Sequence, residues 1–242
     1  MMAMDKGGTG VKPSERIFVA IDTTDLGSAV ELANGLAGHV GGIKLGWEFF
    51  TAHGPEGVKQ VTAAGTPLFL DLKFHDIPNT IAGAMRAALP MKPKFINVHA
   101  SGGMAMMRAA YDAASEAGDE RPLLLAVTVL TSLSDDDLAK AGVFGTVTEQ
   151  VVRLGVMAQD SGMDGVVCSA KEIMALRGAC GPDFKLVVPG IRPEGTDVQD
   201  QKRVVTPREA VALGADHLVI GRPITQAADP VAAAKAIAEG LS

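Results

Sequence analysis

The chain has 242 residues, 47% of them apolar and 21% charged, so it is long enough to bury a large core as a single barrel domain. The net charge of −6 and the absence of a lysine- or arginine-rich block exclude a general attraction to nucleic acid or to an anionic membrane surface. Cys168 and Cys180 form no Cys-x-x-Cys pair, which favours a reducing, cytoplasmic compartment over a disulfide scaffold.

Residues 1–13, MMAMDKGGTGVKP, lack the continuous apolar stretch of a signal peptide, and we expect them to form a flexible leader. Residues 14–242 are expected to form one catalytic domain. The longest strongly apolar run, at 123–130, is less than half as long as a helix that crosses a bilayer. No membrane association is therefore expected.

Short β-branched or aliphatic runs alternate with longer Ala-rich segments whose apolar residues recur at helical spacing, which predicts βα units around a parallel sheet. The predicted strands are 16–22, 40–46, 67–73, 94–100, 123–130, 164–169, 184–191 and 216–222. The predicted helices include 26–37, 77–89, 102–117, 146–161, 206–213 and 230–240. Eight such units in this length predict an α/β fold of the (β/α)8 TIM-barrel type. A doubly wound open sheet is the alternative, but VAIDTTDLGS stands where its GxGxxG fingerprint would follow the first strand.

Two connections have features of their own. The segment after Ile191, RPEGTDVQDQKRVV, is polar and longer than most βα loops, so we expect a mobile lid there. Ser134 precedes three consecutive aspartates and is expected to cap a short helix.

Charged residues stand at the ends of the first three predicted strands. Asp22 ends the first strand, Lys44 lies near the end of the second, and Asp71 and Lys73 end the third. TIM-barrel active sites lie at the carboxyl ends of strands, and residues two apart share a face, so these four side chains are expected to converge. Solvated surface pairs, worth about 1 kcal/mol or less each, are the structural alternative. A lysine and aspartate cluster suits a reaction that develops negative charge on carbon and then needs a proton.

The last two strands predict a phosphate site. VVPGIRP places Arg192 just after Gly190, and LVIGRP places Arg222 just after Gly221. Glycine permits close backbone approach, arginine can meet phosphate with two N–H groups, and Pro223 suits the first position of a short helix. TIM barrels often bind phosphate at these two strand ends.

The stretch DLKFHDIPNT resembles the Asp-x-Lys-x-x-Asp-Ile-x-x-Thr motif of the orotidine 5′-phosphate decarboxylase family, with Asp71, Lys73, Asp76, Ile77 and Thr80 at the motif positions. The resemblance continues through VAID, GIKLG, VTVLTS, VVPGIRP and VIGRPI. It implies a TIM barrel that decarboxylates orotidine 5′-phosphate to UMP in pyrimidine biosynthesis. The family works as a homodimer and uses no metal or organic cofactor.

The resemblance also implies roles for residues of the charged cluster. Lys73 would protonate C6 of the pyrimidine as carbon dioxide leaves, and Asp71 would lie near the substrate carboxylate. Lys44 would complete the network and, with Asp22, contact the ribose.

Further roles are implied for residues outside the cluster. Asp76 and Thr80 would cross a dimer interface into the partner's site. Thr131 would touch the pyrimidine edge, or Ser132 if the alignment slips by one. The phosphate contacts would be Arg192, Gln201, Gly221 and Arg222.

Two alternative functions remain open. Mg²⁺-dependent sugar-phosphate lyases, such as ketogulonate-phosphate decarboxylase and hexulose-phosphate synthase, share the Asp-x-Lys-x-x-Asp motif but have a metal-ligating Glu where Lys44 stands, and a cation there argues against a metal. A catalytically silent nucleotide-binding barrel would need the phosphate site but not Lys73. His75 and His99 lie near strand ends, and whether either touches substrate is left open.

Overall fold

The computed structural model describes residues 11–192 and 205–241. Most of the predicted leader and most of the predicted lid, including Gln201, lie outside the described residues. At the start of the described chain, a turn of 3-10 helix (η1, Pro13–Arg16) leads directly into the first strand.

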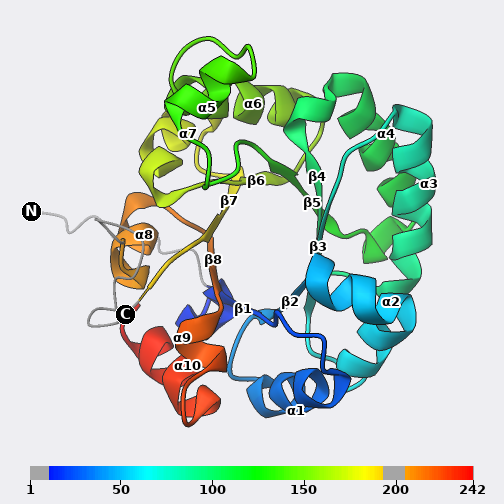
Figure 1. Cartoon of the computed structure of the whole chain (residues 1–242), viewed down its shortest axis with the longest axis vertical. Coiled ribbons are helices and arrows are strands. Elements are labelled where there is room, and N and C mark those ends of the chain that lie inside the picture. Colours follow the sequence, from blue (N-terminus) through cyan, green and yellow to red (C-terminus); the bar gives the residue numbers. More distant parts are fainter. Residues whose placement is uncertain (1–10, 193–204, 242) are drawn as a thin grey trace, which may run out of the picture.

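Eight parallel strands close into a barrel in the order of the sequence, so the predicted (β/α)8 fold is confirmed (Figure 1). Each strand pairs with the next, and β1 pairs with β8 to complete the ring. The strands are β1 Ile17–Ala20, β2 Gly42–Gly46, β3 Leu68–Phe74, β4 Phe95–His99, β5 Leu123–Val127, β6 Gly165–Val167, β7 Lys185–Pro189 and β8 His217–Ile220. All eight predicted strands are present, most of them shorter than predicted.

The helices surround the barrel on its outside (Figure 1). They are α1 Leu26–Leu36, α2 Trp47–Val61, α3 Pro78–Ala88, α4 Met104–Ser115, α5 Asp135–Lys140, α6 Val147–Asp160, α7 Ile173–Cys180, α8 Pro207–Leu213, α9 Arg222–Thr225 and α10 Pro230–Glu239, with short 3-10 turns η2 Leu89–Met91, η3 Ala100–Gly102, η4 Gly118–Glu120 and η5 Ala170–Glu172. Helix α5 is capped by Ser134, whose hydroxyl accepts the N–H of Asp137 at 3.3 Å, as predicted. No helix within the described ranges is long and apolar enough to cross a membrane.

Two helices, α2 and α7, were not among those predicted. Helix α2 is interrupted at Gly54, whose φ of 58° breaks the helical path just before Pro55. Glycine followed by proline is typical of a turn, so these two residues did not predict a helix. Helix α7 has 8 residues and directly follows the 3-10 turn η5.

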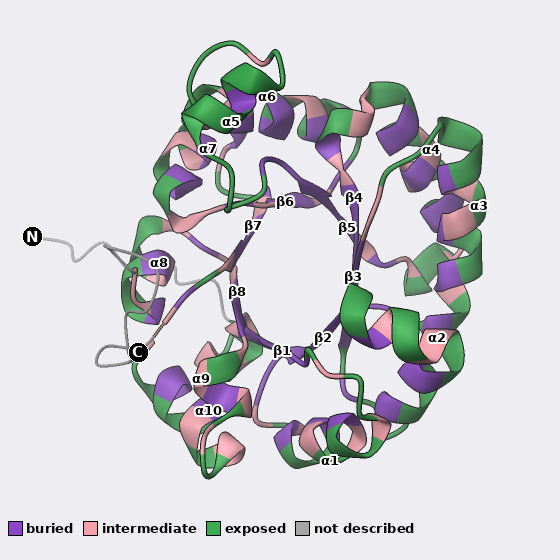
Figure 2. Ribbon diagram, in the orientation of Figure 1, coloured by how far each residue is buried: buried purple, intermediate pink, exposed green. Residues whose placement is uncertain are grey.

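The strands have two buried faces, which is why they are almost continuously apolar. One face packs against the helices, whose outward sides are exposed (Figure 2). The other face fills the barrel with a separate cluster that includes Phe18, Phe69, Phe95 and Leu125. Phe18 and Phe95 lie 4.8 Å apart between ring centroids, and the His217 ring lies 5.0 Å from Phe95. Because these rings come from early positions of their strands, they fill the amino-terminal half of the barrel and leave its carboxyl end for a ligand.

Aspartates tie the strands together at the amino-terminal end of the barrel. Asp164 immediately precedes β6, and its carboxylate accepts the N–H of Leu124 in β5 at 2.7 Å. The same carboxylate pairs with Arg121 at 2.7 Å. One side chain therefore fixes the starts of two neighbouring strands.

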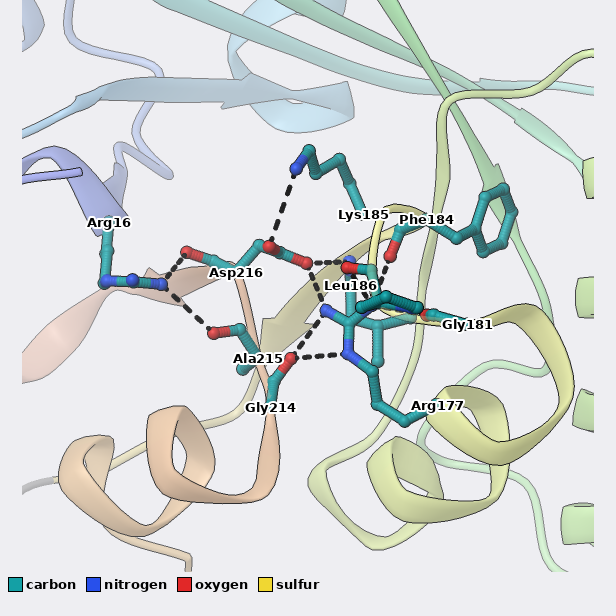
Figure 3. A network of polar contacts seen from close by, with 10 residues as sticks. Arg16, Arg177, Gly181, Phe184, Lys185, Leu186, Gly214, Ala215 and Asp216 are labelled. Atoms are coloured by element: carbon teal, nitrogen blue, oxygen red, sulfur yellow. Dashed lines mark hydrogen bonds and ion pairs between the residues drawn. The ribbon is translucent and has the colours of Figure 1, made fainter. Parts of the chain in front are cut away.

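Asp216 repeats this arrangement between β7 and β8 (Figure 3). It precedes β8, accepts the N–H of Leu186 at 2.8 Å and pairs with Arg177 of α7. The guanidinium of Arg177 also donates to the carbonyl oxygens of Gly181, Pro182, Phe184 and Gly214. Arg177 thus joins the turns before β7 and β8 to helix α7.

Candidate active site

Four charged side chains meet at the carboxyl end of the barrel. Asp22 lies just beyond β1, Lys44 lies on β2, and Asp71 and Lys73 lie on β3. The Nζ of Lys44 is 3.2 Å from Oδ1 of Asp22 and 3.3 Å from Oδ2 of Asp71, and the Nζ of Lys73 is 2.7 Å from Oδ1 of Asp71. The structure therefore brings these four predicted residues into one row of alternating charges.

Asp71 is the centre of this row and is only 8% exposed. Burial alone would raise the pKa of its carboxyl, but Lys44 and Lys73 and the hydrogen bonds from Lys73 and Asn97 hold the pKa below its usual value. The carboxylate is therefore ionised at neutral pH. With one oxygen facing each lysine, it orients both ammonium groups.

The backbone at Lys73 departs from a regular strand. Its φ is 48°, in the left-handed region, and the pairing of β3 with β4 shifts register between Leu70 and Phe74. The N–H of Lys73 donates to Oδ1 of Asn97 at 2.7 Å, and Nδ2 of Asn97 donates to Oδ1 of Asp71 at 2.6 Å. Asn97 was not among the predicted site residues, although an amide within the apolar run KFINVHA was a signal that could have identified it.

A cavity of about 220 Å³ opens beside the charged row. Lys44, Asp71 and Lys73 line one side of it, and the rest of its wall is mainly apolar. The remaining lining residues are Phe69, Val127, Val129, Leu130, Thr131, Val167, Cys168, Pro189 and Val219. Thr131 lines the cavity, whereas Ser132 is not among its lining residues.

Three of the predicted phosphate-binding residues, Arg192, Gly221 and Arg222, lie beyond the ends of β7 and β8, which border the cavity through Pro189 and Val219. Gly190 has a φ of 75°, which a residue with a side chain rarely adopts, and Arg192 follows it by two positions. Gly221 lies between β8 and α9, which begins at Arg222. Arg192, Gly221 and Arg222 therefore lie beyond adjacent strands of the barrel, and Gln201 lies outside the described residues.

Asp76 and Thr80 are not brought to the cavity of their own chain. Both are exposed, in the loop after β3 and in the first turn of α3. Oδ1 of Asp76 accepts the N–H of Ile77 at 2.6 Å. Ile77 itself is 66% exposed, which is unusual for a large apolar side chain. Asp76, Ile77 and Thr80 therefore form an exposed edge of the chain.

The rings of His75 and His99 lie close together, with centroids 5.4 Å apart. Burial lowers the pKa of His99, and the neighbouring His75 and Lys73 lower it further. Neither histidine is among the residues that line the cavity. Within the described ranges, no group of three or more His, Cys, Asp or Glu side chains is placed to hold a metal ion.

Comparisons with known proteins place the chain among relatives that share its whole barrel. The model of the Orotidine 5'-phosphate decarboxylase / HUMPS family matches residues 15–237. The chain is 60% identical to an orotidine 5'-phosphate decarboxylase of Rhodospirillum rubrum, over 92% of each chain. It is 54% identical to one of Paramagnetospirillum magneticum, over 90% of this chain and 94% of that one. The crystal structure of orotidine 5'-phosphate decarboxylase from Lactobacillus acidophilus superposes with a TM-score of 0.84 at 39% identity, covering 93% of this chain and 98% of that chain.

Proposed function

The chain belongs to the Orotidine 5'-phosphate decarboxylase / HUMPS family, and we propose that it decarboxylates orotidine 5′-phosphate to UMP in pyrimidine biosynthesis. The observation that carries this proposal is the charged row at the cavity, with Lys73 and Lys44 on the two oxygens of Asp71. Because both oxygens already face ammonium groups, Asp71 is poorly suited to bind Mg²⁺. This favours the decarboxylase over a metal-dependent sugar-phosphate lyase.

The reaction breaks the bond between C6 of the pyrimidine and its carboxylate. The electron pair remains on C6, in the ring plane and outside the π system, so the ring cannot delocalise it. In the proposed mechanism the ammonium group of Lys73 stabilises this charge and then donates its proton to C6, and solvent reprotonates the lysine. Two unit charges about 4 Å apart interact by roughly 4 kcal/mol at an effective dielectric of about 20, which corresponds to about a thousandfold in rate.

The neighbouring residues would bind and orient the nucleotide. Asp71 would lie near the substrate carboxylate and hold Lys73 in place, since the two side chains already contact each other at 2.7 Å. Lys44 and Asp22 would contact the ribose. Thr131, which also lines the cavity, would contact the pyrimidine edge.

The phosphate group, which lies far from the reacting carbon, would contribute binding energy. The proposed contacts are Arg192, Gln201, Gly221 and Arg222. Binding energy from a non-reacting group can be used to organise the charged residues around the transition state. Loss of these contacts should therefore lower kcat as well as raise KM.

We also propose a homodimer in which each subunit completes the other's site with Asp76 and Thr80. The exposed Ile77 supports this, because the edge that carries Asp76 presents an apolar side chain to solvent. A cytoplasmic location fits the two cysteines, which are buried free thiols.

Turnover by metal-stripped protein tests the proposed reaction. Purified enzyme treated with EDTA should convert orotidine 5′-phosphate to UMP, with loss of the pyrimidine absorbance and release of carbon dioxide. The Lys73→Ala variant should lower kcat by about a thousandfold or more, because it removes both the cation and the proton donor. Unchanged absorbance with wild-type protein would indicate a nucleotide-binding barrel without activity, and activity abolished by EDTA would indicate a metal-dependent lyase.

A further inference from the structure

Asn97 contacts both halves of the Asp71 and Lys73 pair although it belongs to a different strand. It lies on β4 and is 0% exposed. Its Oδ1 accepts the backbone N–H of Lys73 at 2.7 Å, and its Nδ2 donates to Oδ1 of Asp71 at 2.6 Å. The Asn97 amide thus accepts a hydrogen bond from the backbone of Lys73 and donates one to the side chain of Asp71.

The contact to Lys73 supports an unusual backbone conformation. With a φ of 48°, Lys73 occupies the left-handed region, and the ladder between β3 and β4 is irregular at this point. A buried N–H that loses its partner in the ladder needs another acceptor. Asn97 supplies that acceptor from within the barrel, so the bulge can form without leaving the N–H unpaired.

The contact to Asp71 restricts the carboxylate. Oδ1 of Asp71 receives Nζ of Lys73 at 2.7 Å as well as the Asn97 amide, while Oδ2 faces Nζ of Lys44 at 3.3 Å. With donors on both sides, rotation of the carboxylate would break at least one contact. Without the amide, only the two flexible lysines would hold it.

We propose that Asn97 is a positioning residue, which locks the Lys73 backbone and the Asp71 carboxylate together so that the Lys73 ammonium group faces the cavity. This role rests on the decarboxylation proposed above. Asn97 touches no substrate, because it lies behind the cavity wall and is not among its lining residues. Its effect should therefore appear in the chemical step rather than in nucleotide affinity.

The Asn97→Leu variant keeps the side-chain size and removes both hydrogen bonds. It tests whether the chemical step is impaired while nucleotide affinity is retained. Its kcat for orotidine 5′-phosphate should fall by about a hundredfold, with KM within about threefold of wild type, since small misplacement of a catalytic group costs about that much in rate. The matched control is Thr66→Val, which removes another buried side-chain hydrogen bond, from Thr66 to the Ala33 carbonyl. Its kcat should stay within about threefold of wild type.

The Asn97→Asp variant provides a second test that also covers failure of the leucine variant to fold. The introduced carboxyl keeps an acceptor for the Lys73 N–H but, when ionised, repels Asp71. Protonation restores a donor, so the ratio of its kcat to that of wild type should rise as pH falls from 8 to 5.5. A flat ratio, or an Asn97→Leu kcat within threefold of wild type, would overturn the proposal.

Crystal structures of wild type and the two Asn97 variants give a readout that needs no turnover. Loss of the amide should move the Lys73 backbone out of the left-handed region, or lengthen the distance between its Nζ and Oδ1 of Asp71 by more than about 1 Å relative to wild type. An unchanged pair would overturn the positioning role. If wild-type protein failed to decarboxylate orotidine 5′-phosphate, the proposed function would fall, and these structures would still decide whether Asn97 positions the pair.

Discussion

Lys73 adopts a backbone conformation that a lysine rarely takes by itself. A left-handed φ costs an L-residue roughly 1–2 kcal/mol, and here φ is 48°. The surrounding contacts offset this cost, since the N–H reaches Asn97 and the ammonium group reaches Asp71. Strain of this kind concentrates where a side chain must be aimed at a site rather than at its neighbours. The side chain that we assign to proton transfer is therefore also one whose backbone is held in an uncommon conformation by its surroundings.

His217 illustrates the opposite case, a titratable group that the proposed chemistry does not use. Its ring lies among Phe18 and Phe95, and its Nδ1 is buried with no hydrogen-bond partner among the described residues. Burial, assisted by the nearby Lys94, lowers its pKa to about 4, against about 6.5 for an unperturbed histidine. The unfolded chain therefore binds more protons than the native one between these two values. Stability is retained above pH 6.5 and is lost as pH falls toward 4.

We expect His217→Phe to reduce this acid sensitivity. At pH 5 the wild-type histidine should cost about 2 kcal/mol of unfolding free energy relative to pH 7.5, and the variant should not show that loss. Urea unfolding at the two pH values measures the difference, and His39→Phe, which changes a histidine outside the barrel, serves as control. Equal losses in wild type and His217→Phe would show that another group causes the acid sensitivity.

Among the elements, the strands were predictable and some helices were not. The strands could be recognised because burial on both faces makes them continuously apolar, and because charged residues appear where the first three and the last two leave the barrel. The kink at Gly54 and Pro55 concealed α2. The bulge at Lys73 could not be read from β3 alone, since it depends on a side chain of β4. Asn97 stands out in the sequence as an amide within an apolar run, but the residues that it contacts lie on another strand.

The turns around β7 and β8 depend on one side chain, and we expect Arg177→Met to lower the unfolding free energy by about 3 kcal/mol. The change leaves Asp216 without its main partner and several carbonyl oxygens without a donor in a largely buried place (Figure 3). The matched control is Arg86→Met, which breaks the exposed pair with Glu116. Thermal or urea unfolding should show a much smaller effect for the control. Similar effects of the two changes would contradict the structural role of Arg177.

Across the whole molecule, the two ends of the barrel are built for different purposes. The amino-terminal end is closed by aromatic rings and by the Asp164 and Asp216 contacts, and the carboxyl end holds the charged row and the cavity. The net charge of −6 would repel an anionic nucleotide at long range. Lysines and arginines at the carboxyl end of the barrel must therefore attract the nucleotide locally. The barrel, the charged row and the strand ends that border the cavity could be predicted from sequence. The partner subunit's share of the site could be inferred only from resemblance.

We propose that Lys73 of one subunit and Asp76 of another act in a single decarboxylating site. Mixing inactive Lys73→Ala with inactive Asp76→Ala, after dissociation and reassociation, tests this sharing. Random exchange between equal amounts should make about half of the dimers mixed, and each mixed dimer has one intact site of its two. The mixture should therefore regain about a quarter of the activity of the same amount of wild-type protein. Neither variant should recover when it is treated alone. No recovery, with mixed dimers demonstrated by mass, would contradict a site shared between subunits.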